Sequence, residues 1–140
     1  MSIFSFRKDE ILRKKKLIDR LFAEGSSFYI YPFKVFYLAV PLEVKSPAQV
    51  LISVGKRSFK HAVDRNRIRR QIRESFRQHK QQLYDHLEKK QGQCMLAIIY
   101  TANVHIPSAD QEVKIKAVLK RLSNEIDRKL NNPSPSLSDK

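Results

Sequence analysis

Apolar residues gather in three short runs that are typical of β-strands. These runs are "FKVFYLAV" from Phe33 to Val40, "QVLISV" from Gln49 to Val54, and "MLAIIY" from Met95 to Tyr100. Each is rich in aromatic and β-branched residues, which pack well on a pleated surface. The pattern therefore predicts three strands, with "PLEVKSPA" as the loop between the first two.

Three other segments predict α-helices. The first is short and stops at Gly25, which has the character of a helix C-cap. Asp64 is the expected N-cap of a long second helix that runs to about Leu87. The last helix is expected to start where Ser108 and Gln111 have the spacing of a capping box. The apolar positions of the first and last helices are Leu17, Ile18, Leu21 and Phe22, and Ile115, Leu119, Leu122 and Ile126.

A length of 140 residues suits one domain with a core of its own. We expect this domain over residues 1–130. The first sixteen residues are polar and basic and predict a loose arm, flexible over residues 1–10, and residues 131–140 have too little apolar content to fold. No window approaches the ~18 to 20 apolar residues of a membrane span. The single cysteine, Cys94, lies in an apolar run and fits a buried side chain in a reducing cytosol.

The charge of the chain points to a polyanionic partner. Lys and Arg number 28 against 14 Asp and Glu, which gives a formal net charge of +14. The segment from Lys56 to Lys80 holds ten of these basic residues with only Asp64 and Glu74 to offset them. A charge this large exceeds what solubility requires, so nucleic acid or an anionic membrane surface is implied.

The segment from Lys60 to Lys80 combines a core-facing stripe with a ridge of cations. On a helical wheel, the stripe comprises Ile68, Ile72, Ser75, Phe76, His79, Leu83 and Leu87. The ridge comprises Asn66, Arg69, Arg70, Arg73, Arg77 and Lys80. Like charges at this spacing repel by about 0.2 to 0.5 kcal/mol per pair, so folding alone would not favour the ridge. Guanidinium groups bind phosphate through paired hydrogen bonds, which favours nucleic acid over a membrane surface or a merely solvated charged face.

The stretch "RNRIRRQIRESFR", Arg65 to Arg77, resembles the RNR signature of the bacterial ribonuclease P protein subunit. "ISVGKRSFKHAVD" is similar to the strand and basic loop before that signature, while "LIDRLFAEGSSF" and "MLAIIYTAN" resemble the family's first helix and last strand. The resemblance covers roughly Ile11 to Ile126. It implies an α/β fold of the α+β sandwich kind, with a four-stranded sheet, a long central RNR helix, helices at both ends and a left-handed βαβ crossover. One short strand is therefore expected beyond the three.

The resemblance implies a protein subunit that helps a catalytic RNA to remove the 5′ leader from precursor tRNA. Its partners would be the ribonuclease P RNA and precursor tRNA in the bacterial cytoplasm, with no membrane and no small-molecule substrate. The active site and its Mg²⁺ would belong to the RNA, so no catalytic or metal-binding residue is expected here. The implied RNA-binding residues are Lys56, Arg57, Lys60, Arg65, Asn66, Arg67, Arg69, Arg70, Arg73 and Arg77. The implied leader cleft comprises Ile18, Phe22, Phe33 and Phe36.

The sequence departs from the family pattern at two places. Ile18 stands where the family commonly has an aromatic residue, and the stretch from Gly55 to Asp64 is one residue longer than the common pattern. Simple core packing is the alternative role for the four cleft residues.

Two other functions remain open from the residues alone. The first is a structural or ribosome-associated RNA-binding protein. The second is a protein-only nuclease, which would need clustered carboxylates or paired histidines. The four histidines show no such clustering, and no Cys and His spacing builds a closed metal site. The four histidines are His61, His79, His86 and His105.

Overall fold

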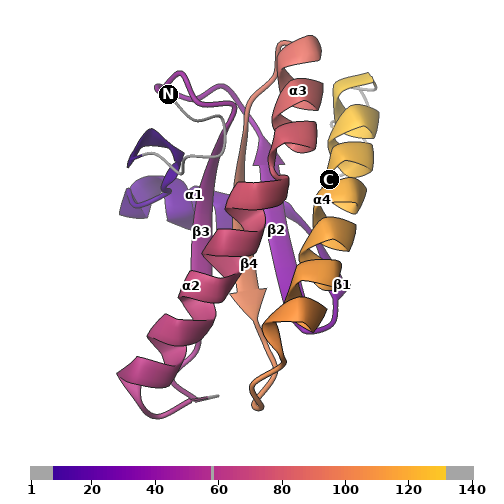
Figure 1. The fold of residues 1–140 in the computed structure, drawn as a ribbon. Coiled ribbons are helices and arrows are strands. Elements are labelled where there is room, and N and C mark those ends of the chain that lie inside the picture. Colours follow the sequence, from indigo (N-terminus) through magenta and orange to yellow (C-terminus); the bar gives the residue numbers. More distant parts are fainter. Residues whose placement is uncertain (1–7, 58, 132–140) are drawn as a thin grey trace.

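The computed structural model describes residues 8–57 and 59–131 (Figure 1). The chain forms a short 3₁₀ helix, four α-helices and four strands within these residues. In chain order they are η1 (Lys8–Glu10), α1 (Lys15–Glu24), β1 (Ser26–Ile30), β2 (Phe33–Ala39), β3 (Ala48–Val54), α2 (Ala62–His79), α3 (Gln81–Lys89), β4 (Cys94–Tyr100) and α4 (Ser108–Asn131). The three predicted strands are confirmed as β2, β3 and β4. The expected fourth strand is β1.

The four strands form one mixed sheet in the order β1-β2-β4-β3. β1 pairs with β2 and β2 with β4 in antiparallel fashion, whereas β3 and β4 are parallel. A parallel pair needs a crossover, and α2 and α3 supply it. In Figure 1, β3 lies to the left of β4, both strands run downward and α2 lies in front of the sheet. This crossover is left-handed, against the usual right-handed rule, as the family resemblance implied.

The sheet carries side chains on two faces, which we name by the helices that cover them. The front face packs against α2, α3 and α4 and forms the larger core, which includes Val35, Phe76 and Ile98. The back face is covered by α1 and the segment before it, through a smaller core around Leu21 and Met95. This division follows from the two-residue period of the strands, which sends alternate residues to opposite faces.

The predicted long helix is interrupted. α2 begins at Ala62 with His61 at its N-cap, so Asp64 lies in the first turn rather than at the cap position. Its carboxylate still complements the positive end of the helix dipole there. α2 ends at His79, and α3 starts at Gln81 after Lys80, whose φ and ψ are −72° and −19°. The predicted core stripe is confirmed, because its apolar members on both helices are buried.

The segment before α1, where the sequence predicted a loose arm, makes defined backbone contacts with the sheet. Ile11 forms a parallel bridge with Val50 of β3, and the Leu12 amide donates to the Val50 carbonyl at 3.0 Å. Leu12 and Glu10 are both buried, since η1 and Leu12 cover the edge of the sheet. The arm expected over residues 1–7 and the tail expected over 132–140 lie outside the described residues.

The start of α4 differs from the predicted capping box. The helix begins at Ser108, and the Gln111 amide donates to the Pro107 carbonyl at 3.0 Å. The buried side chain of Gln111 donates instead to the Ile106 carbonyl and to Oε1 of Gln71, at 2.6 and 3.0 Å. It therefore ties the loop before α4 to α2. In the part of the chain that the structure describes, no helix is both long and apolar enough to cross a bilayer.

Candidate nucleic-acid interface

The exposed side of α2 and the loop before it carry a set of cations and one asparagine, which we call the α2 ridge. Its members are Lys56, Arg57, Lys60, Asn66, Arg67, Arg69, Arg70 and Arg73. All of them are exposed except Arg69, which is half-buried. The Nη1 atom of Arg69 donates to Oδ1 of Asn66 at 3.1 Å, so the asparagine orients a neighbouring guanidinium. The opposite side of α2 is anchored in the core, so this helix holds the cations on a rigid support.

Arg65 has a different role from the cations that follow it. Its Nη1 atom donates to the carbonyls of Phe59 and Lys60 at 2.8 and 2.9 Å. These bonds fasten the basic loop to the first turn of α2, and Phe59 packs against Tyr100 with ring centroids 6.0 Å apart. Arg65 therefore positions Lys60 and its neighbours, in addition to contributing its own charge.

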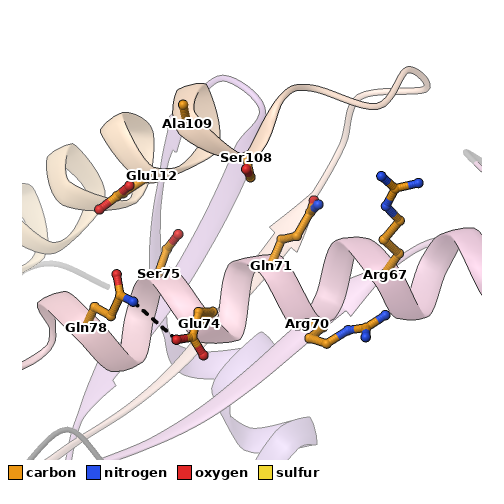
Figure 2. Close-up of a pocket in the computed structure, with 9 residues that line it drawn as sticks. All are labelled: Arg67, Arg70, Gln71, Glu74, Ser75, Gln78, Ser108, Ala109 and Glu112. Carbon is orange, nitrogen blue, oxygen red and sulfur yellow. Dashed lines mark hydrogen bonds between the residues drawn. The ribbon is translucent and has the colours of Figure 1, made fainter.

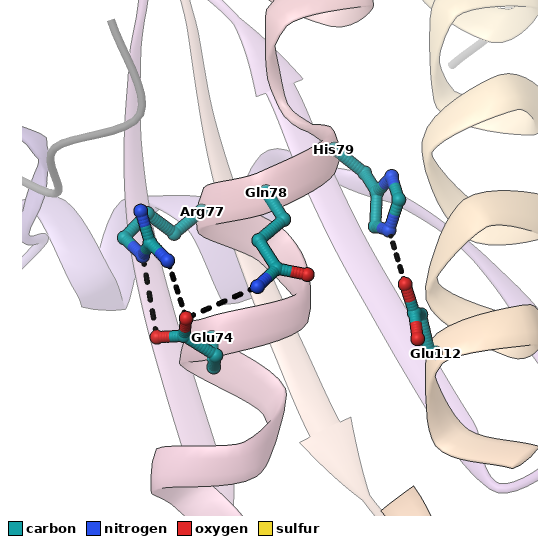
Figure 3. Close-up of polar contacts among 5 residues, drawn as sticks. All are labelled: Glu74, Arg77, Gln78, His79 and Glu112. Carbon is teal, nitrogen blue, oxygen red and sulfur yellow. Dashed lines mark hydrogen bonds and ion pairs between the residues drawn. The ribbon is translucent and has the colours of Figure 1, made fainter. Parts of the chain in front are cut away.

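Two of the predicted ridge cations are engaged with carboxylates. Arg77 is ion-paired with Glu74 one turn earlier on α2 (Figure 3). The hydrogen bond from Arg77 holds the pKa of Glu74 below its ordinary value, which favours the charged form of the pair. Lys80 is buried and lies 2.5 Å from Oε2 of Glu10. Lys80 was predicted to belong to the ridge, and this is wrong, because the bend between α2 and α3 turns its side chain into the protein.

A groove of about 660 Å³ runs between α2 and the start of α4 (Figure 2). Arg67 and Arg70 lie at one end of it, and Glu74 and Glu112 lie toward the other. Nε2 of His79 and Oε2 of Glu112 are 2.6 Å apart and link the two helices beyond this acidic end (Figure 3). The groove is therefore polarised, and its arginine end offers a site for phosphate beside the ridge.

The back face of the sheet carries an aromatic surface beside α1, which we call the back cleft. It comprises Ile18, Phe22 and Phe36. Phe22 on α1 is 40% exposed, and its ring packs edge-on against Phe36 of β2 with centroids 4.8 Å apart. Ile18 and Phe36 are half-buried against the small core of this face. The two phenylalanines are thus supported from below while part of the surface is open.

Phe33 does not belong to the back cleft, which corrects the prediction. Its side chain is fully buried on the front face, where its ring centroid lies 6.0 Å from that of Tyr100. Phe33 and Phe36 are three positions apart on one strand, so the alternation of β2 sends them to opposite faces. The core-packing alternative is therefore correct for Phe33.

Lys34 is a candidate binding residue that the sequence reasoning missed. It shares the back face with Phe36, and its Nζ atom lies 5.6 Å from the centroid of that ring. The signal was present, because residues two apart on a strand share a face and Phe36 was already a candidate. Lys34 places a cation beside the aromatic surface, as binding of a single-stranded nucleic acid requires.

His105, His86 and Cys94 serve contacts between elements or are buried, whereas His61 is exposed at the start of α2. His105 contacts Gln71 at 3.0 Å, and Nε2 of His86 lies 3.5 Å from Oδ1 of Asp127 on α4. Within the described residues, no group of three or more His, Cys, Asp or Glu side chains is arranged to hold a metal ion. Burial raises the pKa of the Cys94 thiol to about 12, so it is not a thiolate nucleophile at neutral pH.

Comparison with known proteins identifies the family. The sequence profile of the family Ribonuclease P matches residues 6–127, which is most of the chain. The chain belongs to the ribonuclease P family. The Ribonuclease P protein component of Chlorobaculum tepidum is 37% identical over 124 residues, which cover 82% of this chain and 80% of that protein. The corresponding component of Chlorobium phaeobacteroides is 47% identical over 87 residues, although this match spans only 60% of either chain.

Solved structures of this family share the fold. The Staphylococcus aureus RNase P protein superposes with a TM-score of 0.65 at 24% identity, over 81% of this chain and 94% of that one. The Thermotoga maritima RNase P protein gives a TM-score of 0.65 at 21% identity, over 80% and 96% of the two chains. The family resemblance and the α+β fold that it implied are therefore confirmed.

Proposed function

We propose that this chain is the protein subunit of ribonuclease P and assists a catalytic RNA in removing the 5′ leader of precursor tRNA. The observation that carries the proposal is the separation of two surfaces by one sheet. The α2 ridge lies on the front side, and the back cleft lies on the other face with Lys34 beside it. One protein can therefore hold a structured RNA and a single strand at the same time.

The α2 ridge is the proposed docking surface for the RNA subunit. Four of its cations, Arg67, Arg69, Arg70 and Arg73, lie on a helix that is fixed in the core, so their backbone needs no further ordering when they meet phosphates. Arginine can bind a phosphate through two parallel hydrogen bonds, and the groove beside Arg67 and Arg70 is positioned to accept one. Arg65 keeps the loop that carries Lys60 close to the helix and so extends this surface.

The back cleft is the proposed grip on the leader. Stacking of a base on an aromatic ring is worth about 1 to 3 kcal/mol and depends little on base identity. Phe22 and Phe36 supply two rings, and Ile18 supplies apolar contact only. This tolerance suits an enzyme whose substrates carry leaders of different sequence.

The proposed catalytic centre lies in the RNA subunit, which would hold Mg²⁺ to activate water for phosphodiester hydrolysis. This chain offers no cluster of metal ligands among its described residues, so we assign it no step at the metal. Its own residues neutralise phosphates at the ridge and orient the leader at the back cleft. Both actions bring two polyanions together, which electrostatic repulsion would otherwise oppose. The proposal places this work in the bacterial cytoplasm.

Reconstitution tests the proposal directly. The purified protein, a bacterial ribonuclease P RNA and 5′-labelled precursor tRNA are combined at low Mg²⁺, and cleavage is compared with that by each component alone. We expect cleavage at the mature 5′ end only when both subunits are present. Tight RNA binding without any stimulation would favour a structural or ribosome-associated RNA-binding protein. Cleavage by the protein alone would indicate a protein-only nuclease.

A further inference from the structure

Two exposed tyrosines lie at the tip of the β1–β2 hairpin, outside both surfaces described above. The side chains of Tyr29 and Tyr31 are 50% and 51% exposed. Their ring centroids are 6.4 Å apart and their planes meet at 66°. Two neighbouring exposed aromatic rings form an apolar patch, which is a candidate contact surface.

The strand register connects this pair to the back cleft. In the pairing of β1 with β2, Ser27 lies opposite Phe36 and Tyr29 lies opposite Lys34. Residues opposite each other in a sheet share a face, so Tyr29 lies on the back face beside Lys34. The back face therefore presents, in order, Phe22, Phe36, Lys34 and Tyr29, with Tyr31 beyond them in the turn.

Hydrogen bonds hold the Tyr29 ring in place although half of it is exposed. Its hydroxyl lies 3.0 Å from Oγ1 of Thr101. Thr101 donates its own hydroxyl proton to the Pro32 carbonyl at 2.8 Å, so Tyr29 is the donor in the first bond. The Thr101 amide also donates to the Pro32 carbonyl at 2.8 Å, which fixes the turn to the end of β4. A ring already held in this way loses little freedom when a base stacks on it.

We propose that Tyr29 and Tyr31 form a base-stacking platform that extends the back cleft along the leader. A leader held at Phe22 and Phe36 would pass Lys34, which contacts a backbone phosphate, and place a further base on the tyrosines. Alternation of rings and a cation along one line matches a single-stranded nucleic acid better than it matches a protein partner. This inference rests on the proposed function, because it needs a leader in the back cleft.

An abasic scan of the leader tests the platform. The holoenzyme is assembled with the wild-type protein or with the Tyr29→Ala/Tyr31→Ala variant, and its affinity is measured for precursors with an eight-nucleotide leader. Each precursor lacks one base while keeping every phosphate, so only stacking is removed. With the wild-type protein, one or two abasic positions should weaken binding by about 5-fold to 100-fold through the tyrosines. With the variant, the same abasic positions should cost nothing further.

Matched variants separate stacking from structure. Tyr29→Phe/Tyr31→Phe keeps both rings and should retain the wild-type dependence on leader bases. Phe36→Ala should also remove the dependence of affinity on leader bases, but at other leader positions than the tyrosine variant does. If the double alanine variant does not fold, as judged by circular dichroism, Tyr31→Ala alone carries the test.

Two outcomes would overturn the platform and leave the proposed function standing. One is that, at every leader position, the loss of affinity caused by the abasic site and the loss caused by the double alanine variant simply add. The other is an equal loss of affinity for precursor and for leaderless tRNA, which would place the tyrosines against the tRNA body or the RNA subunit. Failure of the wild-type protein to stimulate cleavage at all would overturn the proposed function itself.

Discussion

Lys80 and Arg73 are seven positions apart in sequence, and both were predicted to lie on the cationic ridge. Arg73 is exposed on α2, whereas Lys80 is buried with Glu10 and Tyr84 where α2 meets α3. The Tyr84 hydroxyl also donates to Glu10. Burial raises the pKa of Tyr84 most, and this hydrogen bond raises it further. The cluster joins the segment before α1 to the central helices, so Lys80 contributes to folding rather than to docking.

Removing the lysine from this cluster should destabilise the protein. Lys80→Ala leaves the Glu10 carboxylate buried without its ammonium partner, and breaking such a pair costs about 3 to 5 kcal/mol. Urea unfolding followed by circular dichroism measures the loss. Arg73→Ala is the control, because it removes an exposed charge and should change the free energy of unfolding by less than about 0.5 kcal/mol. Equal effects of the two substitutions would contradict the structural role of Lys80.

Phe36 and Phe33 allow a second comparison of single residues. Phe36→Ala should weaken binding of leader-bearing precursor by about 5-fold to 100-fold, since it removes a stacking ring, while affinity for the RNA subunit stays unchanged. Phe33→Ala opens a cavity in the front core and should instead cost about 3 to 5 kcal/mol of stability. Filter binding and thermal unfolding measure the two effects. Loss of RNA-subunit affinity in Phe36→Ala would contradict the assignment of the back cleft to the leader.

Among the elements, α4 is fastened to the sheet by a polar contact as well as by its apolar stripe. The Tyr37 hydroxyl of β2 donates to Oε1 of Glu125 at 2.9 Å, and Nη2 of Arg128 donates to the same oxygen at 3.1 Å. Burial and this bond raise the pKa of Tyr37 to about 12. Burial opposes ionisation of Glu125, but the bond from Tyr37 and the charge of Arg128 outweigh it and lower the pKa of Glu125.

The lowered pKa makes the contribution of Glu125 depend on pH. A carboxylate whose pKa is lower in the folded state stabilises the fold at pH values above its pKa in the unfolded chain, which is about 4.3. This stabilisation is lost as the pH falls through the pKa of the folded state. Glu125→Gln should therefore cost about 1 kcal/mol at pH 7 and progressively less below pH 4. Urea titrations at several pH values measure the difference from wild type. Glu24→Gln, at an exposed pair on α1, should have little effect at any pH.

The helix α2 should contribute to RNA docking separately from α1 and β2. Arg69→Ala with Arg73→Ala removes two ridge cations and should weaken association with the RNA subunit while the fold is unchanged. Lys116→Ala with Lys120→Ala is the matched control, because it removes two exposed cations from α4. Gel-shift titration measures association. Equal losses from the two pairs would mean that net charge, rather than the ridge, governs docking.

The elements also show what the sequence could predict. β2, β3 and β4 were recognisable because each is a run of branched and aromatic residues. β1 was missed because it is a five-residue edge strand that begins with two serines. The break at Lys80 had no signal, since no glycine or proline marks it and Glu10, the carboxylate that Lys80 contacts, is distant in sequence. Phe33 was misplaced because the cleft residues were carried over from the family resemblance. The alternation of β2 separates Phe33 from Phe36 and would also have revealed Lys34.

Considered as a whole, the molecule places the α2 ridge and the back cleft on opposite faces of one sheet. The fold places the ends of β3 and β4, the basic loop and the first turn of α2 at one end of the sheet (Figure 1). The hairpin tip with Tyr29 and Tyr31 lies at the same end. Phe33, the first residue of β2, and Val54, the last residue of β3, both pair with Tyr100 at the end of β4. A single-stranded RNA leader that leaves the back cleft toward this end would therefore approach the side on which the RNA subunit is proposed to dock.

The salt dependence of RNA binding tests how many of these cations act together. Seven cations of the α2 ridge form no ion pair among the described residues: Lys56, Arg57, Lys60, Arg67, Arg69, Arg70 and Arg73. If about five to seven phosphates are neutralised, log affinity should fall with log salt at a slope of roughly −4 to −6, because each contact releases bound counterions. Arg69→Ala with Arg73→Ala should reduce the slope by about 2, and Phe36→Ala should leave it unchanged. Titrations between 50 and 400 mM salt, roughly the range in which these contacts are screened, measure the slope. A slope near −1 would mean that the ridge does not meet the RNA as a unit, and α2 would then be no docking surface.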